Sequence, residues 1–207
     1  MIVAVDGPTA SGKGTIAAAI ARHFGLPHLD TGLLYRAVGW HVVRDGGDPD
    51  AAGDALAAVG FPEALLLDPR LRTEEAGSLA SRVSIHPQVR DALFQRQRAF
   101  ATQVGGAVLD GRDIGTVIAP DADVKLFVTA SAAERARRRW LEMRGRGIAI
   151  ELAEIERDIV RRDARDIGRA DAPLRPASDA LILDTSAFGK EQAIQTAIET
   201  IEETLRR

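Results

Sequence analysis

Short apolar runs alternate along the chain with longer stretches in which apolar residues recur every three or four positions. The short runs predict strands at Ile2 to Val5, His28 to Leu29, Ala107 to Leu109, Val124 to Val128 and Ala180 to Leu183. After the first run, Ile16, Ile20 and Phe24 recur at a spacing of four, which predicts a helix that stops at Gly25 and Pro27. Because strands separated by helices need crossover connections, the pattern predicts an α/β fold with a buried parallel sheet.

Each predicted strand ends at or just before a polar residue. These residues are Asp6, Asp30, Asp110, Thr129 and Asp184. In a parallel sheet the carboxyl ends of the strands meet at one edge, where such folds bind their ligands. We therefore expect the functional site at this edge.

A glycine-rich segment follows the first predicted strand and opens the first predicted helix. It reads Gly7-Pro8-Thr9-Ala10-Ser11-Gly12-Lys13-Gly14-Thr15. Small residues let successive backbone N–H groups point at one anion, the lysine reaches the outer phosphates, and the helix N-terminus adds about half a positive charge. The usual phosphate loop has Ser or Thr directly after the lysine, whereas this chain has Gly14 there and Thr15 one position later. The segment predicts a nucleoside triphosphate site of the small-kinase type; the alternative is a tight strand-to-helix turn without a ligand.

Length, charge and cysteine content narrow the class of protein. At 207 residues the chain can form one domain with small appendages, or at most two domains. A net charge of -3 and a pI near 5.8 argue against a nucleic-acid or membrane-surface partner. The chain has no cysteine, which excludes disulfides and thiolate zinc sites, and no run approaches the roughly 18 apolar residues of a membrane span. We expect a cytoplasmic protein, and a monomer because no extended apolar helix face is left over.

Two stretches interrupt the alternation of strands and helices. Residues 45–68 are rich in Gly, Ala, Pro and Asp, which indicates a small peripheral arm. Residues 145–175 are dense in charge and flanked by glycines and prolines, which is typical of a mobile lid.

Charged residues of the lid region follow a helical pattern. Ser131 and Glu134 match a capping box at the start of an arginine-rich helix. Further on, Arg162, Asp166 and Arg169 fall on one helical face if the helix persists that far. The alternative interpretation is a solvated face with exposed ion pairs, which contribute little.

The third predicted strand runs into Asp110-Gly111-Arg112-Asp113. A carboxylate at the position of Asp110 orients Mg²⁺ through water in a Walker-B-like manner, while Arg112 and Asp113 face the ligand site. The alternative is an Asx-type turn with a surface arginine.

Short motifs extend over nearly the whole chain. They are Asp6-Gly7-Pro8 through Thr15, Leu29-Asp30-Thr31-Gly32 with Tyr35-Arg36, Arg72-Thr73-Glu74-Glu75, Ala80-Ser81, Pro87-Gln88-Val89-Arg90, Arg96-Gln97-Arg98, Asp110 through Thr116, Arg161-Arg162-Asp163, Asp166, Arg169, Ala172-Pro173-Leu174 and Asp179-Ala180. In this order and spacing they resemble the bacterial cytidylate kinase family.

The resemblance implies a P-loop NTPase fold with a five-stranded parallel sheet in the order 2-3-1-4-5, flanked by helices. It implies a single nucleoside monophosphate kinase domain with a core at residues 1–44, 82–144 and 176–207, a monophosphate-binding arm at about 45–81 and a helical lid at about 145–175. The implied reaction is transfer of the γ-phosphoryl group of ATP to CMP or dCMP, with Mg²⁺ as cofactor.

The resemblance also implies roles for individual residues. ATP phosphates are expected on Gly7 to Thr15, Mg²⁺ on Thr15 and on Asp110 through water, and catalysis from Lys13, Asp110 and Arg162. The expected CMP contacts are Thr31, Arg36, Ser81, Arg90, Arg112, Asp113, Arg162, Asp166 and Arg169.

The chain departs from the family pattern in one place, because the stretch between Arg36 and Ser81 is shorter than in many relatives. Two other functions stay open at this point. One is a kinase for another small acceptor, such as UMP, AMP, shikimate or gluconate. The other is a nucleotide-dependent binding module without turnover.

Overall fold

The computed structural model describes residues 1–206. It divides into two compact units. The sheet unit consists of Met1–Leu29 together with the chain from Ala101 onward, and the helical unit consists of Asp30–Phe100.

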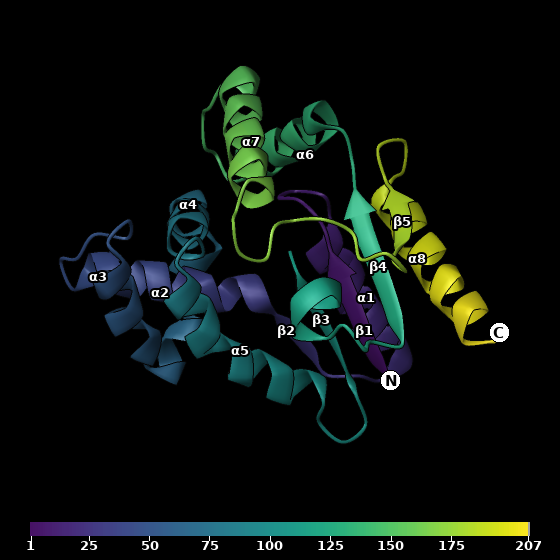
Figure 1. Ribbon diagram of the computed structural model, residues 1–207. Coiled ribbons are helices and arrows are strands. Elements are labelled where there is room, and N and C mark those ends of the chain that lie inside the picture. The colour runs from purple at the N-terminus through teal and green to yellow at the C-terminus, as the bar shows by residue number, and fades with distance from the viewer. Residues whose placement is uncertain (207) are drawn as a thin grey trace. The chain divides into compact units, whose positions relative to one another are not determined.

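The sheet has five strands in the order β2-β3-β1-β4-β5 (Figure 1). The strands are β1 (Ile2–Asp6), β2 (His28–Asp30), β3 (Ala107–Gly111), β4 (Val124–Thr129) and β5 (Leu181–Asp184). β1 pairs in parallel with β3 and β4, so that Val3 lies between Val108 and Val124, and β4 pairs in parallel with β5. The predicted α/β class and strand order are confirmed, and every predicted strand is found within two residues of its expected bounds.

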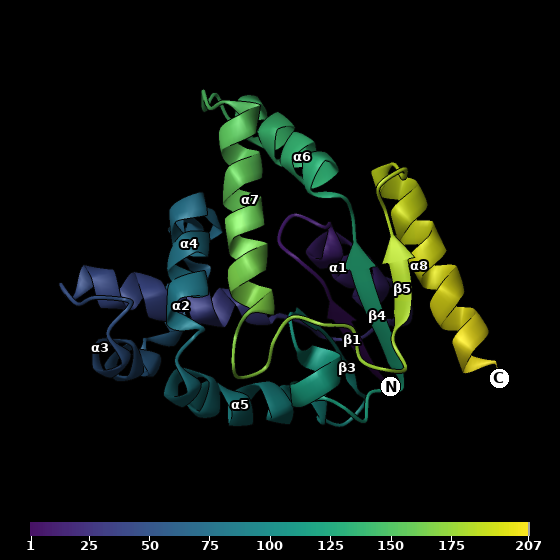
Figure 2. The same ribbon diagram turned by 45° about the horizontal axis from the view of Figure 1, so that its top comes forward.

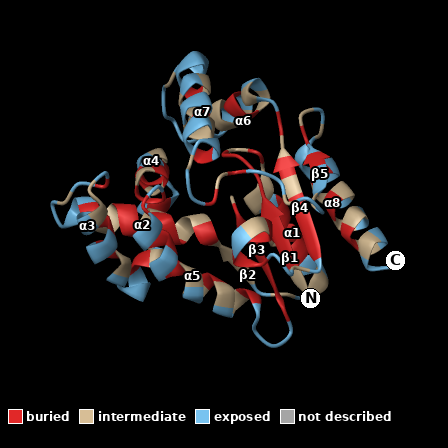
Figure 3. Ribbon diagram, in the orientation of Figure 1, coloured by how far each residue is buried: buried red, intermediate tan, exposed pale blue. Residues whose placement is uncertain are grey.

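Helices α1 (Lys13–Phe24) and α8 (Lys190–Leu205) cover one face of the sheet. Alternate side chains of a strand point to the same face, so Val3 and Val5 enter this layer together. They pack with Ile16, Ile20 and Ile201, all at most 2 % exposed. Figure 3 shows the central strands of this core, β1, β3 and β4, as mostly buried. Burying each such side chain stabilises the unit by about 1.5–3 kcal/mol.

The other face of the sheet carries Ala4, Asp6 and Lys125, since Lys125 lies opposite Ala4. The π-helical turn η4 (Ile114–Ile118) lies against β1 on this side. A Cβ added to Gly115 would approach the Cγ and Cδ of Lys125 to 3.2 Å, so glycine lets the turn approach the lysine stem closely. The Nζ of Lys125 donates to Asp179 at 2.7 Å.

Helices α6 (Ala132–Gly145) and α7 (Leu152–Ile167) form a packed pair, seen side by side in Figures 1 and 2. A small apolar cluster of Ala136, Ile155 and Ile159 joins them. Only one of the two hydrogen bonds of the predicted capping box forms. Ser131 Oγ accepts from the N–H of Glu134 at 3.2 Å, but the N–H of Ser131 donates to Ser186.

The prediction that Arg162, Asp166 and Arg169 share one helical face is partly wrong. Arg162 and Asp166 lie on α7, but the helix ends at Ile167 and Gly168 follows as its C-cap. Arg169 therefore lies beyond the helix. It still reaches its neighbour, because its Nε donates to the carbonyl of Asp166 at 3.2 Å.

The helical unit contains α2 (Thr31–Arg44), α3 (Ala52–Ala57), α4 (Glu74–Val83) and α5 (Pro87–Ala101), with 3-10 turns η1 (Ala58–Gly60), η2 (Glu63–Leu67) and η3 (Pro69–Arg72). It has its own apolar core, in which Leu34, Val38 and Leu71 are fully buried. α2 and α4 approach closely at Gly39, where an added Cβ would lie 2.7 Å from the Cβ of Leu79.

The predicted arm at about 45–81 lies wholly within the helical unit, which also contains α2 and α5. Residues 45–68 form α3, η1 and η2, and they contribute Ala55, Phe61 and Leu65 to the core of this unit. The boundaries of an arm and a lid stay predictions, since they concern motion. Among residues 1–206, no helix is both long and apolar enough to cross a bilayer.

Candidate active site

The phosphate loop connects β1 to α1, in the strand-loop-helix arrangement that its sequence predicts. Gly12, with φ of 89°, is the N-cap of α1. At Gly7, an added Cβ would lie 2.0 Å from the carbonyl oxygen of Val128, so only glycine fits there. The Nζ of Lys13 donates to the carbonyl of Pro8 at 3.3 Å. The loop therefore holds its lysine against its own backbone, at the N-terminus of a helix that favours anions.

Asp110 lies at the end of β3 and is 3 % exposed. Its Oδ1 is 2.7 Å from Nε2 of His28, and its Oδ2 is 3.6 Å from the position that a Cβ on Gly14 would take. The carboxylate thus lies beside the start of α1, next to the phosphate loop. His28 was predicted only as the first residue of a strand, with no role at the site.

The residues near Asp110 suit a magnesium ion whose coordination shell is completed by water and phosphate oxygens. Carboxylate and hydroxyl oxygens are hard donors of the kind that Mg²⁺ prefers, and Mg²⁺ usually keeps several waters. Asp110 supplies a carboxylate, and Thr15 on the first turn of α1 supplies an exposed hydroxyl. Within residues 1–206, no group of three or more His, Asp or Glu side chains is arranged to hold a metal.

Three of the predicted acceptor residues meet around Asp166. Nε of Arg112 donates to its Oδ2 at 2.9 Å, and Arg169 donates to its backbone carbonyl. Asp166 is 4 % exposed, and this burial acts to raise its pKa. The charges of Arg112, Arg169 and Arg162 outweigh the burial, so the pKa of Asp166 is lowered and the group is a carboxylate at neutral pH.

Asp113 is buried directly before η4, and its carbonyl accepts from the N–H of Val117 at 2.8 Å. Its charge acts on Asp6, a residue to which no role at the site was assigned from the sequence. The two carboxylate oxygens of Asp6 accept from the N–H groups of Ile114 and Gly115, each at 2.8 Å. Burial raises the pKa of Asp6 to about 7, the two hydrogen bonds oppose the rise, and the charge of Asp113 adds to it.

The other four predicted acceptor contacts lie in the helical unit. Thr31 is the buried first residue of α2, and Nη1 of Arg36 donates to the carbonyls of Leu71 and Thr73 at 2.8 and 2.9 Å. Ser81 is buried on α4. Arg90 is 6 % exposed on α5, with its guanidinium 5.9 Å from the ring centroid of Tyr35.

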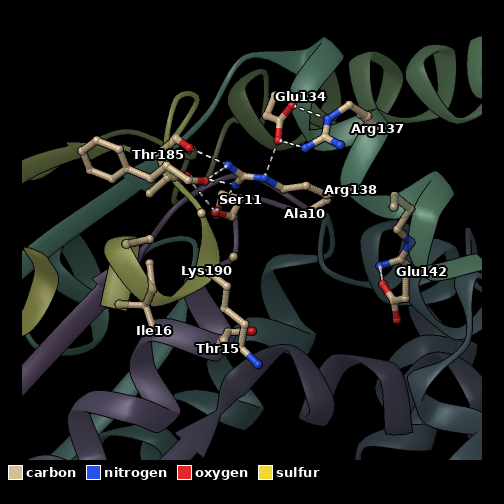
Figure 4. Close-up of a pocket in the computed structure, with 15 residues that line it drawn as sticks. Ala10, Ser11, Thr15, Ile16, Glu134, Arg137, Arg138, Glu142, Thr185 and Lys190 are labelled. Carbon is tan, nitrogen blue, oxygen red and sulfur yellow. Dashed lines mark hydrogen bonds and ion pairs between the residues drawn. The ribbon is translucent and has the colours of Figure 1, made fainter. Parts of the chain in front are cut away.

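A pocket of about 370 Å³ opens beside the phosphate loop, with Ser11, Gly12 and Thr15 in its wall (Figure 4). Arg138 crosses the top of this pocket. Its Nε donates to Glu134 at 3.0 Å, and its Nη1 donates to Thr185 Oγ1 at 3.0 Å. Hydrogen bonds from Arg137 and Arg138 lower the pKa of Glu134 to about 2.

One side of this pocket comes from the start of α8 and the loop before it, and it was not predicted from the sequence. It includes Phe188, Gly189 and Lys190. Arg139 also lines the pocket. Burial lowers the pKa of Arg139, Glu142 opposes this, and the nearby charges of Arg162 and Arg146 add to it. An anion in this region would relieve the repulsion between the arginines.

A parallel sheet with a phosphate loop after its central strand, and with arginines gathered in the same unit, defines a phosphate-loop nucleotide-binding enzyme of the kinase type. The match to known sequences is more specific. A family model described as cytidylate kinase matches residues 3–203, and the chain therefore belongs to the cytidylate kinase family.

Several relatives are similar over nearly their full length. A cytidylate kinase of Cereibacter sphaeroides is 58 % identical over 97 % of this chain and 94 % of the relative. Those of Granulibacter bethesdensis and Methylocella silvestris are 54 % and 52 % identical, over 97 % and 98 % of this chain and 96 % and 94 % of each relative. A solved structure of an uncharacterized protein from Eubacterium ventriosum shares the fold at a TM-score of 0.56, with 14 % identity and 98 % of each chain covered.

Proposed function

We propose that this chain is a nucleoside monophosphate kinase that transfers the γ-phosphoryl group of ATP to CMP or dCMP, giving ADP and CDP or dCDP. Its membership of the cytidylate kinase family supports this assignment. The observation that carries it is the cluster of Arg112, Asp166 and Arg169 in the same compact unit as the phosphate loop. A phosphate loop alone binds a donor, whereas the cluster adds groups for a second anionic substrate.

ATP binds with its phosphates on Gly7 to Thr15, where backbone N–H groups and the N-terminus of α1 face the anion. The rest of the nucleotide enters the pocket that Arg138 and Thr185 border. When phosphates arrive, Lys13 exchanges its hydrogen bond to Pro8 for contacts to the outer phosphates.

Mg²⁺ would be held by the hydroxyl of Thr15 and, through water, by Asp110, which His28 orients. The ion neutralises charge on the β- and γ-phosphates when it is bound. The Oδ2 of Asp110 faces the start of α1, since a Cβ added to Gly14 would lie 3.6 Å from it.

The proposed acceptor contacts are assigned by the chemistry of their side chains. Arg36, Arg112 and Arg169 hold the monophosphate, since a guanidinium presents paired donors that match phosphate oxygens. Arg90 and Asp113 read the cytosine edge, where a donor and an acceptor distinguish the exocyclic amine from the carbonyl of uracil. Thr31, Ser81 and Asp166 contact the pentose or the base.

Catalysis requires positioning and charge neutralisation, because phosphoryl transfer needs little covalent help from the protein. Lys13 and Arg162 stabilise the negative charge on the transferring group. Arg162 is suited to this role by its place on α7, where its charge already acts on Asp166 and Arg139. We expect the enzyme to act as a cytoplasmic monomer without a nucleic-acid partner, and sedimentation tests the oligomeric state.

A coupled ADP-release assay with ATP and Mg²⁺ tests the proposal across CMP, dCMP, UMP, AMP and GMP. We expect CMP or dCMP to give the highest kcat/KM, and we expect Lys13→Ala to lower kcat/KM strongly for every acceptor. A preference for another acceptor would indicate a different small-molecule kinase. Tight ATP binding without turnover would indicate a binding module.

A further inference from the structure

Arg135 is a buried arginine that joins three parts of the sheet unit. It is 5 % exposed, and its Nε donates to the carbonyl of Ala130 at 2.9 Å, just after β4. Its Nη1 donates to the carbonyl of Thr9 in the phosphate loop at 3.1 Å. Its two terminal nitrogens also bind Asp163 of α7 in a bidentate pair, at 3.1 and 2.5 Å. One guanidinium thus connects the sheet, the phosphate loop and the second helix of the α6–α7 pair.

The tip of the phosphate loop also makes an apolar contact with this helix pair. Ala10 packs against the cluster of Ala136, Ile155 and Ile159. Ala10 has φ of 58°, a left-handed conformation that is unfavourable for a residue other than glycine. Such a conformation persists only where the surroundings hold it. Here the hydrogen bond to Thr9 and the apolar contact of Ala10 hold adjacent residues of the loop.

The helix that Asp163 anchors carries two residues of the proposed site. Arg162 directly precedes Asp163, and Asp166 follows one turn later on the same helix. Asp163 is 18 % exposed, so its pair with Arg135 is largely shielded from solvent, and a shielded bidentate pair fixes orientation as well as distance. The placement of Arg162 relative to the phosphate loop therefore depends on this pair.

We propose that Arg135 and Asp163 are positioning residues that couple the phosphate loop to the helix carrying Arg162. Neither side chain contacts the substrates in this role. Arg135 acts through the carbonyl of Thr9, which sets the tip of the loop, and through Asp163, which sets α7. The proposal rests on the proposed function, because it takes Arg162 to act on the transferring group.

The first test is kinetic and uses Asp163→Asn. This change keeps the size of the side chain but removes the charge that holds α7 to Arg135. We expect kcat to fall by about 10- to 100-fold, as for a catalytic group displaced by a fraction of its ideal geometry, while KM for ATP changes by less than about threefold. Asp158→Asn is the matched control, since Asp158 lies on the same helix and pairs with Arg161 at the surface. The control should retain wild-type kinetics.

A second variant guards against loss of folding. Asp163→Glu keeps the charge pair with Arg135, so the helices stay packed, but the extra methylene shifts α7 against the loop. We expect a lower kcat with an unchanged melting temperature. A residue with a merely structural role would leave kcat unchanged in this variant.

Hydrogen exchange tests the coupling directly, without activity. In Asp163→Asn we expect faster exchange of amides in residues 7–13, as well as in α7, since Arg135 then holds the loop alone. Faster exchange confined to α6 and α7 would overturn the coupling. In Asp158→Asn neither segment should change.

Arg162→Ala separates this inference from the proposed function. If Arg162→Ala is inactive while both Asp163 variants turn over normally, the coupling is wrong and the role of Arg162 stands. If Arg162→Ala turns over normally, the proposed function of that residue is wrong, and the hydrogen-exchange result alone decides whether the loop and helix are coupled.

Discussion

Asp6 predicts an unusual dependence of stability on pH. Its carboxylate is 4 % exposed at the end of β1, and burial raises its pKa from 3.8 to about 7. Between these two values the native state keeps a proton that the unfolded state has lost. The free energy of unfolding therefore falls as the pH rises, and the contribution is lost once the pH passes the folded pKa.

The rise of about three pKa units corresponds to about 4 kcal/mol in total, at about 1.36 kcal/mol per unit. Over a range that is practical to measure, from pH 5 to pH 8, linkage gives a loss of about 2 to 3 kcal/mol from this group, most of it below pH 7. Asp6→Asn removes the ionisation but keeps the shape of the side chain. The difference in unfolding free energy between wild type and variant should therefore change by this amount across the range.

Urea denaturation followed by circular dichroism, at four or five pH values, measures that difference. Histidines and other groups distant from Asp6 titrate equally in both proteins, so their contributions cancel. Asp123→Asn controls for the chemical change itself, because the Asp123 carboxylate accepts from the N–H of Ile2 at the opposite end of β1, at 2.7 Å and at an exposed site. Parallel stability curves for wild type and Asp6→Asn would refute the reasoning. They would mean that the two hydrogen bonds from η4 fully compensate the burial of the charge.

Four further outcomes are expected. Lys13→Ala should cost about 3–5 kcal/mol in kcat/KM with the fold intact, because it removes charge stabilisation that grows in the transition state; near-normal turnover in steady-state assays would contradict this. Asp113→Asn should raise KM for CMP far more than the dissociation constant for ATP, and equal losses in calorimetric titrations would contradict its assignment to the acceptor. Gly39→Ala should lower the free energy of unfolding by about 1–3 kcal/mol, because a Cβ there meets Leu79, with Gly53→Ala as a control at a glycine whose surroundings are open. Hydrogen exchange in residues 145–169 should be fast without ligand and slow with CMP and an ATP analogue together. Equal rates in both states would contradict the hypothesis that this segment is a mobile lid.

The features that could be predicted from the sequence are those that depend on residues close together in the chain. The strands, the phosphate loop and the first helix depend on local periodicity and on glycines, and all were found where expected. The resemblance to a family added the strand order, which no local pattern contains. Arg112 and Asp166 were predicted separately as site residues, and the fold brings them into contact across 54 positions of the chain.

The features that were missed depend on distant partners. His28 gives no local indication of its role, because its partner Asp110 lies 82 positions away. Arg135 stands in a run of arginines that reads as a solvated helix face, yet it is buried by contacts with Thr9 and Asp163. The end of α7 was misplaced because a helical spacing of charges continues past Gly168, where the helix itself stops.

The division into units has a consequence for the order of events during synthesis. The helical unit is one uninterrupted segment, Asp30–Phe100, with an apolar core of its own. The sheet unit is interrupted by that segment, because Ile2 pairs with Ala107 and β1 also pairs with β4. Long-range parallel pairing is slow, and a chain emerging from the ribosome tends to fold by units. A nascent chain should therefore complete the helical unit first, while the first strand and its phosphate loop remain unpaired until β3 and β4 have been made.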